Sequence, residues 1–321
     1  MKVIRSAEQV QRLRTISSQK SLTTASESIE WILATHGRTF HFASRFLSPK
    51  LRHDVATLYA FFRTVDDLVD LPSKDRRIED IRIELNAWQS WFAGGRSFPA
   101  PREPLGSRLA AVLDEHCLPT ALLLDFLAGM VSDLEPQDIR NFNELYSYCY
   151  RVAGTVGLAM THIMGVNSPQ ALVAAEKLGI AMQLTNILRD VGSDLAQDDL
   201  ARFDCSPAHL VRLFEEQRGL DDRFRALMRY QIARAHHYYV GGMSGIWLLP
   251  PDCRLPILVA SRLYRRILTV IERKDYNVLR SRASTSFLEK VREAAIAFTL
   301  ARLWRSGEVG PSTGAKALVE D

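Results

Sequence analysis

The sequence has few cysteines and no strong excess of charge of either sign. Its four cysteines, at positions 117, 149, 205 and 253, lie far apart and form no C-x-x-C pair. This spacing argues against a structural zinc site and against a disulfide framework, and it favours a reducing compartment. The net charge of +4 is small for 321 residues. Because the basic residues are also spread along the chain, a nucleic-acid-binding surface is not indicated.

Long apolar runs are missing as well. The longest one, at 152–166, is interrupted by Thr155, Thr161 and His162, and it falls short of the roughly 20 residues that span a bilayer. The first twenty residues lack the apolar stretch that a signal peptide needs. The sequence therefore predicts neither a transmembrane anchor nor a secreted protein.

Sustained alternation of apolar and polar residues, the signal for β-strands, is absent too. Apolar residues instead recur at three- and four-residue spacing, which is typical of helices, over residues 51–70, 120–133, 142–165, 169–190, 221–240, 254–274 and 284–305. None of the intervening turns is long enough for a linker between domains. We predict an all-α protein with one helical domain at 26–305, an N-terminal extension at 1–25 and a disordered tail at 306–321.

What the sequence does contain is an acidic motif inside an apolar helix. The segment FFRTVDDLVD, at 61–70, carries Asp66, Asp67 and Asp70 among apolar residues. On a helix, Asp66 and Asp70 project from one face, one turn apart. A single pair of this kind most often belongs to a solvated helix face. It predicts a bound cation only if a second feature points the same way.

A second acidic motif provides that feature. In the segment QLTNILRDVGSD, Asn186, Asp190 and Asp194 follow one another at four-residue spacing, again within an apolar helix. Buried like charges are costly unless cations neutralise them, and carboxylate oxygens suit Mg²⁺ whose shell is completed by phosphate oxygens. We hypothesise two facing acidic helices that hold a diphosphate through magnesium. Arg63 and Arg189 would take charge from the leaving pyrophosphate.

Longer segments carry a more specific pattern. They are HGRTFHFASRFLSPKLRHDVATLYAFFRTVDDLVD (36–70), YCYRVAGTVGLAMTHIMG (148–165), LGIAMQLTNILRDVGSD (178–194), ARAHHYY (233–239) with GIWLLP (245–250), and LYRRILTVIERKDYNVLR (263–280). In order and in content these segments resemble the squalene/phytoene synthase family of head-to-head prenyl transferases, most closely its phytoene synthases. The resemblance covers most of the chain and implies an isoprenoid-synthase fold, all-α, with one central cavity.

The resemblance also implies roles for individual residues. It assigns metal binding to Asp66, Asp67, Asp70, Asp190 and Asp194. Binding of the substrate diphosphates falls to His36, Arg38, Arg63, Gln183, Asn186 and Arg189. Catalytic positions are Tyr59, Tyr148 and Tyr264, together with Asp66 and Asp190. The three tyrosines could steady carbocations with their π faces or relay protons.

The reaction so implied is the 1-1' condensation of two geranylgeranyl diphosphates to phytoene through prephytoene diphosphate, the first step of carotenoid biosynthesis. Mg²⁺ is the expected cofactor, with Mn²⁺ as a possible substitute, and NADPH is not expected. The expected partners are a prenyl diphosphate substrate and, through peripheral contact, a membrane surface. The expected location is cytoplasmic and peripherally membrane-associated.

Two alternatives stay open. A C30 squalene or dehydrosqualene synthase would use farnesyl diphosphate, one isoprene unit shorter, and sequence alone fixes neither this chain length nor the oligomeric state. A non-catalytic assembly or lipid-binding protein of the same fold is the other. The run SDLAQDDLARFDCSPAHL lacks the Arg-x-Tyr-Leu-Pro loop usual in the family, which favours that alternative, whereas the presence of every acid favours the enzyme.

Two smaller features have open interpretations. Gly154 and Gly157, in VAGTVG, permit close helix packing, or leave room for a prenyl chain, or do both. A basic position near the family's C-terminus falls on Ser281, which Arg280 and Arg282 flank.

Overall fold

The computed structural model describes residues 29–70, 77–96, 99–135, 139, 141–196, 221–279 and 281–306, without the side chains of 38, 193–196 and 304–306. Every regular element within these ranges is helical. This confirms the all-α prediction. The predicted extension and nearly all of the predicted tail, and the connection that follows the second acidic motif, lie outside the described residues.

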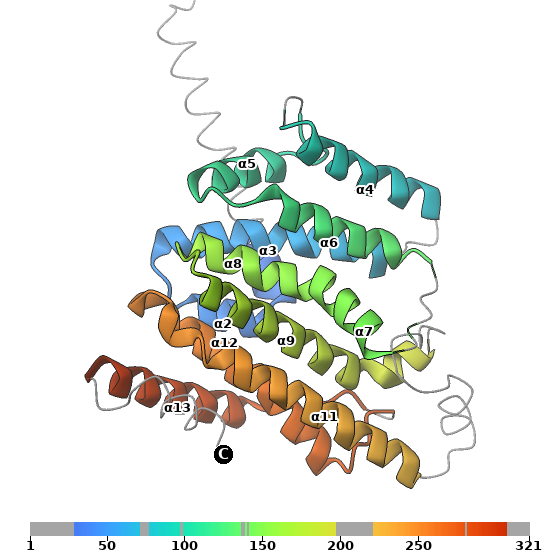
Figure 1. Cartoon of the computed structure of the whole chain (residues 1–321), viewed down its shortest axis with the longest axis vertical. Coiled ribbons are helices and arrows are strands. Elements are labelled where there is room, and N and C mark those ends of the chain that lie inside the picture. Colours follow the sequence, from blue (N-terminus) through green and yellow to red (C-terminus); the bar gives the residue numbers. More distant parts are fainter. Residues whose placement is uncertain are drawn as a thin grey trace, which may run out of the picture.

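The helices pack side by side along the long axis of the molecule (Figure 1). In chain order they are α2 Arg38–Ser44, α3 Pro49–Asp70, α4 Ile78–Ala93, α5 Leu105–Glu115, α6 Thr120–Ser132, α7 Phe142–Cys149, α8 Thr155–Ile163, α9 Pro169–Ala196, α11 Asp222–Met243, α12 Pro251–Arg273 and α13 Phe287–Ser306. A π-helical segment, η1 Tyr150–Gly154, joins α7 to α8, and a 3-10 turn, η2 Ile246–Leu248, precedes α12. In the figure α4 and α5 lie at one end of the molecule, α13 lies at the other, and α9 runs between them.

Local sequence explains where several helices begin. Proline is the first residue of α3, α9 and α12, at Pro49, Pro169 and Pro251, a position where its missing N–H costs nothing. At the start of α13 the Glu289 carboxylate accepts the Ser286 N–H at 2.8 Å, and the Ser286 hydroxyl accepts the Glu289 N–H at 3.3 Å. This reciprocal capping box fixes the entry into α13.

Helix α9 is the central element of the core. It packs against η1, α8, α11 and α12, and glycines bring its backbone unusually close to η1 and α8. A Cβ on Gly157 would lie 2.5 Å from the Ala175 carbonyl oxygen, and one on Gly179 would lie 2.3 Å from that of Ala153. The close-packing interpretation of Gly157 is therefore confirmed. Gly157 also lines the central cavity, so the second interpretation, room for a prenyl chain, is compatible with the first and stays a prediction.

The same helix is long and apolar enough, over Pro169–Gly192, to cross a membrane. Half of that stretch is buried inside the molecule, against the helices named above. A core helix of a globular domain has the same length and composition.

Candidate active site

The first acidic motif occupies the C-terminal turns of α3. The Arg63 guanidinium donates to Asp66 at 3.1 Å and also to Asp67. Burial, followed by the charge of Asp70, raises the pKa of Asp66 to about 7. The Asp66 carboxylate lies deep among protein atoms, yet its side chain keeps 37% of its exposure because it borders a cavity. The arginine therefore compensates the acidic cluster only in part.

The second acidic motif lies on α9, and two arginines grip its Asp190. Arg189 contacts the two carboxylate oxygens at 2.9 and 2.6 Å. Arg282, from the connection between α12 and α13, contacts them at 2.6 and 3.0 Å. Burial acts to raise the pKa of Asp190, but the hydrogen bonds from Arg189 and Arg282 outweigh it and hold that pKa below its ordinary value. Arg282 thus lies at the second acidic motif, whereas the Ser281 hydroxyl beside it accepts from the Lys274 ammonium at 3.1 Å.

A cavity of about 850 Å³ opens beside the two motifs. Helices α2, α3, α8, α9 and α12 contribute to its wall. Among the residues that the sequence assigns to the site, the wall contains His36, Tyr59, Arg63, Asp66, Gln183, Asn186, Arg189 and Tyr264. Residues separated by more than 200 positions in the sequence therefore meet in one concave site.

The cavity is polar on one part of its wall and apolar on the rest. The polar part carries Arg63 and Asp66 from α3 and Gln183, Asn186 and Arg189 from α9. Much of the remaining wall is apolar, with Leu47, Met160, Met164, Leu249 and Ile257 among its side chains. Such a cavity suits a ligand with a charged head and a long hydrocarbon tail.

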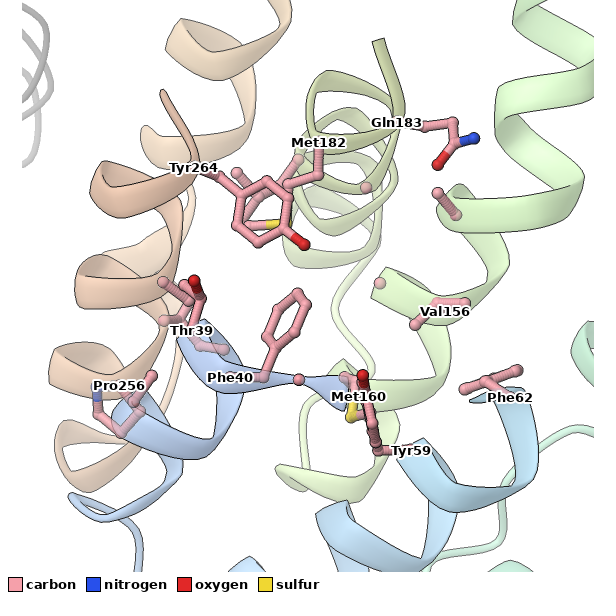
Figure 2. A pocket seen from close by; sticks show the side chains of 18 of the residues that line it. Thr39, Phe40, Tyr59, Phe62, Val156, Met160, Met182, Gln183, Pro256 and Tyr264 are labelled. Carbon is pink, nitrogen blue, oxygen red and sulfur yellow. The ribbon is translucent and has the colours of Figure 1, made fainter. Parts of the chain in front are cut away.

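Aromatic rings line the cavity beside the polar part. Figure 2 shows Phe40 between Tyr264 and Tyr59, with ring centroids 5.4 Å from Tyr264 and 6.1 Å from Tyr59. Burial raises the pKa of both tyrosines, so their hydroxyls stay protonated at neutral pH. Phe40 belongs to the segment 36–70 that resembles the family, but no motif there marks it as a site residue.

Tyr148 occupies a different place from the other two tyrosines. It is buried and is not part of the cavity wall. Its hydroxyl donates to the Asp133 carboxylate at 3.2 Å, and the charge of Asp133 in turn contributes to the raised pKa of Asp66. Tyr148 therefore lies behind the first acidic motif. Asp133, at the end of α6, is a residue that the sequence analysis misses, since no acidic repeat marks it.

Two predicted residues cannot be placed by their side chains. Arg38 begins α2 and Asp194 lies in the last turn of α9, but both side chains lie outside the description. The same holds for the 197–220 connection, where the sequence lacks the family's Arg-x-Tyr-Leu-Pro segment. Asp67, Asp70 and Asp190 lie beside the cavity without forming part of its wall.

Two buried polar atoms in the cavity wall have no hydrogen-bond partner among the described residues. They are the Oδ1 atom of Asn186, an acceptor, and the Nε–H of Arg63, a donor. Buried polar atoms without partners are uncommon in native proteins. An acceptor beside carboxylates fits a hard cation, and a guanidinium donor fits an anionic oxygen. The residues present therefore fit a divalent metal together with a phosphate-bearing ligand.

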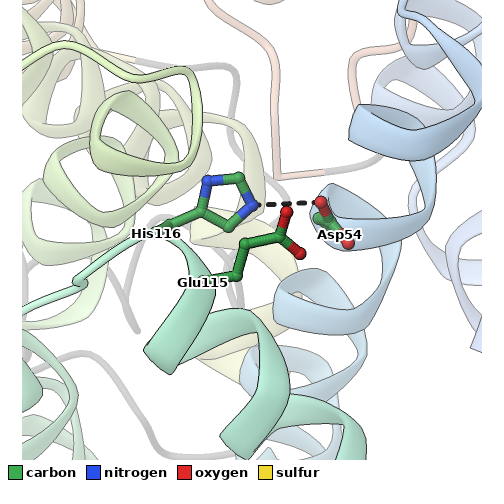
Figure 3. A group of neighbouring side chains, drawn as sticks. All are labelled: Asp54, Glu115 and His116. Carbon is green, nitrogen blue, oxygen red and sulfur yellow. Dashed lines mark hydrogen bonds and ion pairs between the residues drawn. The ribbon is translucent and has the colours of Figure 1, made fainter.

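A third group of ionisable residues lies away from the cavity wall, between α3 and α5. Asp54, Glu115 and His116 come together where α3 meets the end of α5 (Figure 3). His116 contacts Asp54 at 3.0 Å, and the Lys50 ammonium contacts both carboxylates. Asp54 precedes Asp66 by three helical turns, about 18 Å along the axis. Because Lys50 pairs with both carboxylates and His116 contacts Asp54, the group is interpreted as an ion-pair cluster that ties α3 to α5.

Comparisons with known proteins identify the family of the chain. The sequence model of the squalene/phytoene synthases matches residues 33–289. A phytoene synthase of Arthrospira platensis is 37% identical over 273 residues, 78% of this chain and 85% of the relative. A 15-cis-phytoene synthase of Synechococcus elongatus is 35% identical over 286 residues, 82% and 89% of the two chains. A solved dehydrosqualene synthase superposes with a TM-score of 0.74 at 26% identity. The superposition covers 88% of this chain and 98% of that structure's chain. The chain belongs to the squalene/phytoene synthase family and is a prenyl transferase.

Proposed function

We propose that the protein is a phytoene synthase, which condenses two C20 geranylgeranyl diphosphates head to head. The observation that carries the proposal is a cavity whose polar part lies between two acidic motifs and whose remaining wall is largely apolar. Relatives named phytoene synthase, 31–37% identical to this chain, support the choice of product.

The acids of both motifs are the proposed metal ligands. Asp66, Asp67 and Asp70 on α3 and Asp190 with Asp194 on α9 would hold Mg²⁺, or Mn²⁺ as a substitute. The unpartnered Asn186 oxygen next to them supports this role. When bound, the metal would act as a Lewis acid on the departing pyrophosphate.

The cationic side chains bind and orient the diphosphates. Arg63 and Arg189 present guanidinium groups to the polar part of the cavity, where bidentate contacts to phosphate oxygens fix the direction of the leaving group. His36, which lies just before α2, and Gln183 on α9 add hydrogen-bond donors. Arg38 completes this set in the proposal.

The aromatic residues act on the hydrocarbon part of the reaction. Phe40, Tyr59 and Tyr264 present rings next to the place where the diphosphates leave, so their π faces can stabilise positive charge on the reacting carbons. Because the raised pKa values keep both phenols neutral, their hydroxyls are donors rather than bases. The surrounding apolar wall excludes water, which would otherwise quench the cations.

A C30 synthase is the second candidate. The similarity to a solved dehydrosqualene synthase, over 88% of this chain, favours it. The two candidates differ by one isoprene unit, so the side chains of the apolar wall decide between them.

The test is the product itself. Purified protein with Mg²⁺ is incubated with C20 or with C15 diphosphate, each with and without NADPH, and the hydrocarbon is identified by mass spectrometry. We expect phytoene from the C20 substrate without reductant. A C30 product, with no reaction of the C20 substrate, would overturn the C20 assignment and leave the family and the site unchanged. An Asp66→Asn variant controls for non-enzymatic hydrolysis.

The proposed product, a C40 hydrocarbon, is poorly soluble in water and has to pass into an apolar phase. The proposed location is therefore the cytoplasmic surface of a membrane, with peripheral contact only. Fractionation of cells into soluble and membrane pools, with and without a high-salt wash, tests this location.

A further inference from the structure

Helix α13 is held to the molecule by acids that face inward. Glu293 accepts from Arg262 on α12 at 2.8 and 2.7 Å, and both side chains are buried. Glu289, one turn earlier, accepts from Arg266 at 3.3 Å and also from Arg273. Both acids among the described side chains of α13 are therefore committed to α12.

The opposite side of α13 is apolar and exposed. Phe287 and Leu288 are each 78% exposed, Val291 is 49% exposed and Phe298 is 57% exposed. Phe287, Val291 and Phe298 are spaced by four and seven residues, so they share one face. The inward face is apolar as well, through buried Ala297 and Leu300. A helix that is apolar on both faces usually has a partner on each.

The charges beside this exposed stripe are positive. Arg292 and Arg302 are exposed, and Lys290 is half-buried next to them in the sequence. Since the acids face α12, the outer side of α13 combines aromatic and aliphatic side chains with cations. This combination is typical of helices that lie on anionic lipid surfaces.

The position of the helix relative to the cavity adds a reason for such contact. Arg282, Ser284, Thr285 and Lys290, from the connection and the first turn of α13, line the cavity wall. Because Arg282 pairs with Asp190, this stretch of the wall lies next to the polar part of the cavity. Phe287 and Leu288 thus project from the turn of α13 that borders the site.

We propose that the outer face of α13, formed by Phe287, Leu288, Val291 and Phe298 with Arg292 and Arg302, docks on an anionic lipid surface. The docking brings the cavity next to the phase that holds prenyl chains. The benefit of docking for catalysis rests on the proposed function, but the binding of α13 to lipid needs no prenyl diphosphate.

Exposed apolar residues at the other end of the molecule provide a matched control. Ile78 and Ile83 on α4 are 56% and 66% exposed, and α4 lies at the end opposite to α13 (Figure 1). Their neighbours Glu79 and Asp80 are exposed acids. Asp80 pairs with Arg77 and Glu79 pairs with Arg82, so this region has no excess of positive charge that would attract an anionic surface.

The test is flotation of the full chain with vesicles, in the absence of substrate. Vesicles of phosphatidylglycerol and phosphatidylethanolamine are compared with vesicles of phosphatidylcholine alone. We expect binding to the anionic vesicles, a loss of about tenfold or more in the Phe287→Ser/Leu288→Ser variant, and no loss in the Ile78→Ser/Ile83→Ser variant. Arg292→Gln/Arg302→Gln should remove the preference for anionic lipid.

Several outcomes would overturn the proposal. One is equal flotation of the wild type and the Phe287→Ser/Leu288→Ser variant, and another is flotation of neither. If that variant changes the mass by light scattering without vesicles, the face is an interface between copies. If it instead lowers the thermal midpoint by several degrees, the face is covered by the chain's own ends. Phytoene formation from detergent-dispersed substrate is measured in parallel, so that failure of docking and failure of the proposed function are told apart.

Discussion

Arg282 binds the carboxylate of Asp190 through two nitrogen–oxygen contacts of 2.6 and 3.0 Å, although 92 positions separate the residues in the sequence. Asp190 is a proposed metal ligand, so the Arg282 guanidinium contacts the same carboxylate oxygens that a metal would bind. The pair also ties the connection before α13 to the second acidic motif. Metal binding at Asp190 must therefore compete with Arg282.

This competition predicts the effect of Arg282→Gln on the substrate-free protein. The Arg282 side chain is 64% exposed, so the pair contributes only about 0.5–1 kcal/mol. Its loss should tighten Mg²⁺ binding by about two- to fivefold, measured by isothermal titration calorimetry. The control is Arg225→Gln, which removes a similar contact of 2.8–2.9 Å with Asp275 away from the cavity. Unchanged Mg²⁺ affinity in the Arg282 variant would disprove the competition.

The raised pKa of Asp66 predicts a pH-dependent effect of Asp66→Asn on stability. In the unfolded chain this carboxyl ionises near its ordinary value of 3.8, whereas in the folded protein it ionises near 7. The wild type therefore loses stability relative to the variant as pH rises from about 4 to about 7. After allowance for its 37% exposure, we expect an advantage of about 1–2 kcal/mol for the variant at pH 8, in EDTA.

The same variant should lose activity while it gains stability. Turnover with Mg²⁺ should fall about 100-fold or more, because the carboxylate is a proposed metal ligand. Thermal unfolding at pH 4 and pH 8, each with EDTA and with Mg²⁺, separates the two effects. A variant that is less stable than the wild type at pH 8 in EDTA would show that Arg63 fully compensates the acids.

Periodicity predicts the long helices well because their buried faces are long enough to repeat. The seven predicted helices are all present, and α3 and α9 extend their predictions by only a few residues. The prediction of one helix over 142–165 misses η1, since a π-helical turn leaves no trace in apolar spacing. The predicted ranges also omit α4 and α5, although buried residues such as Ile81 and Leu85 in α4 and Leu109 and Val112 in α5 carry helical spacing. They omit α2 as well, whose seven residues are too few for a repeat.

The site residues that the sequence identifies are those that repeat or match a long motif. Asp66 and Asp190 belong to recurring acid spacings; Asp66 lines the cavity and Asp190 lies beside it, while their roles as metal ligands stay predictions. The charge of Asp133 acts on Asp66, and Arg282 pairs with Asp190; the tertiary fold alone brings them to the two motifs. No spacing within one helix encodes such contacts. Fold-dependent neighbours of this kind set the charge balance of the site, and only the structure reveals them.

Close packing of α9 predicts a severe effect of Gly179→Ala. The new Cβ would lie 2.3 Å from the Ala153 carbonyl oxygen, a backbone atom that cannot move alone. We expect a loss of about 2–3 kcal/mol, measured by urea unfolding. In the control, Gly241→Ala on α11, the Cβ would meet the flexible Lys177 side chain at 2.9 Å. There the better helix propensity of alanine should offset the contact, and stability should change little. Equal losses in both variants would contradict the argument.

The buried pair between α12 and α13 predicts opposite effects of breaking it and of replacing it. Arg262 and Glu293 are only 4% and 3% exposed, so Glu293→Ala removes the carboxylate that faces a buried guanidinium and should cost about 3–5 kcal/mol. The Arg262→Met/Glu293→Met variant removes both charges at similar volume and should recover most of that loss. Urea unfolding measures both, and Glu79→Ala, which breaks an exposed pair with Arg82, should change stability by about 0.5 kcal/mol or less. A double variant no more stable than Glu293→Ala would mean that α13 depends on the charges themselves rather than on filled space.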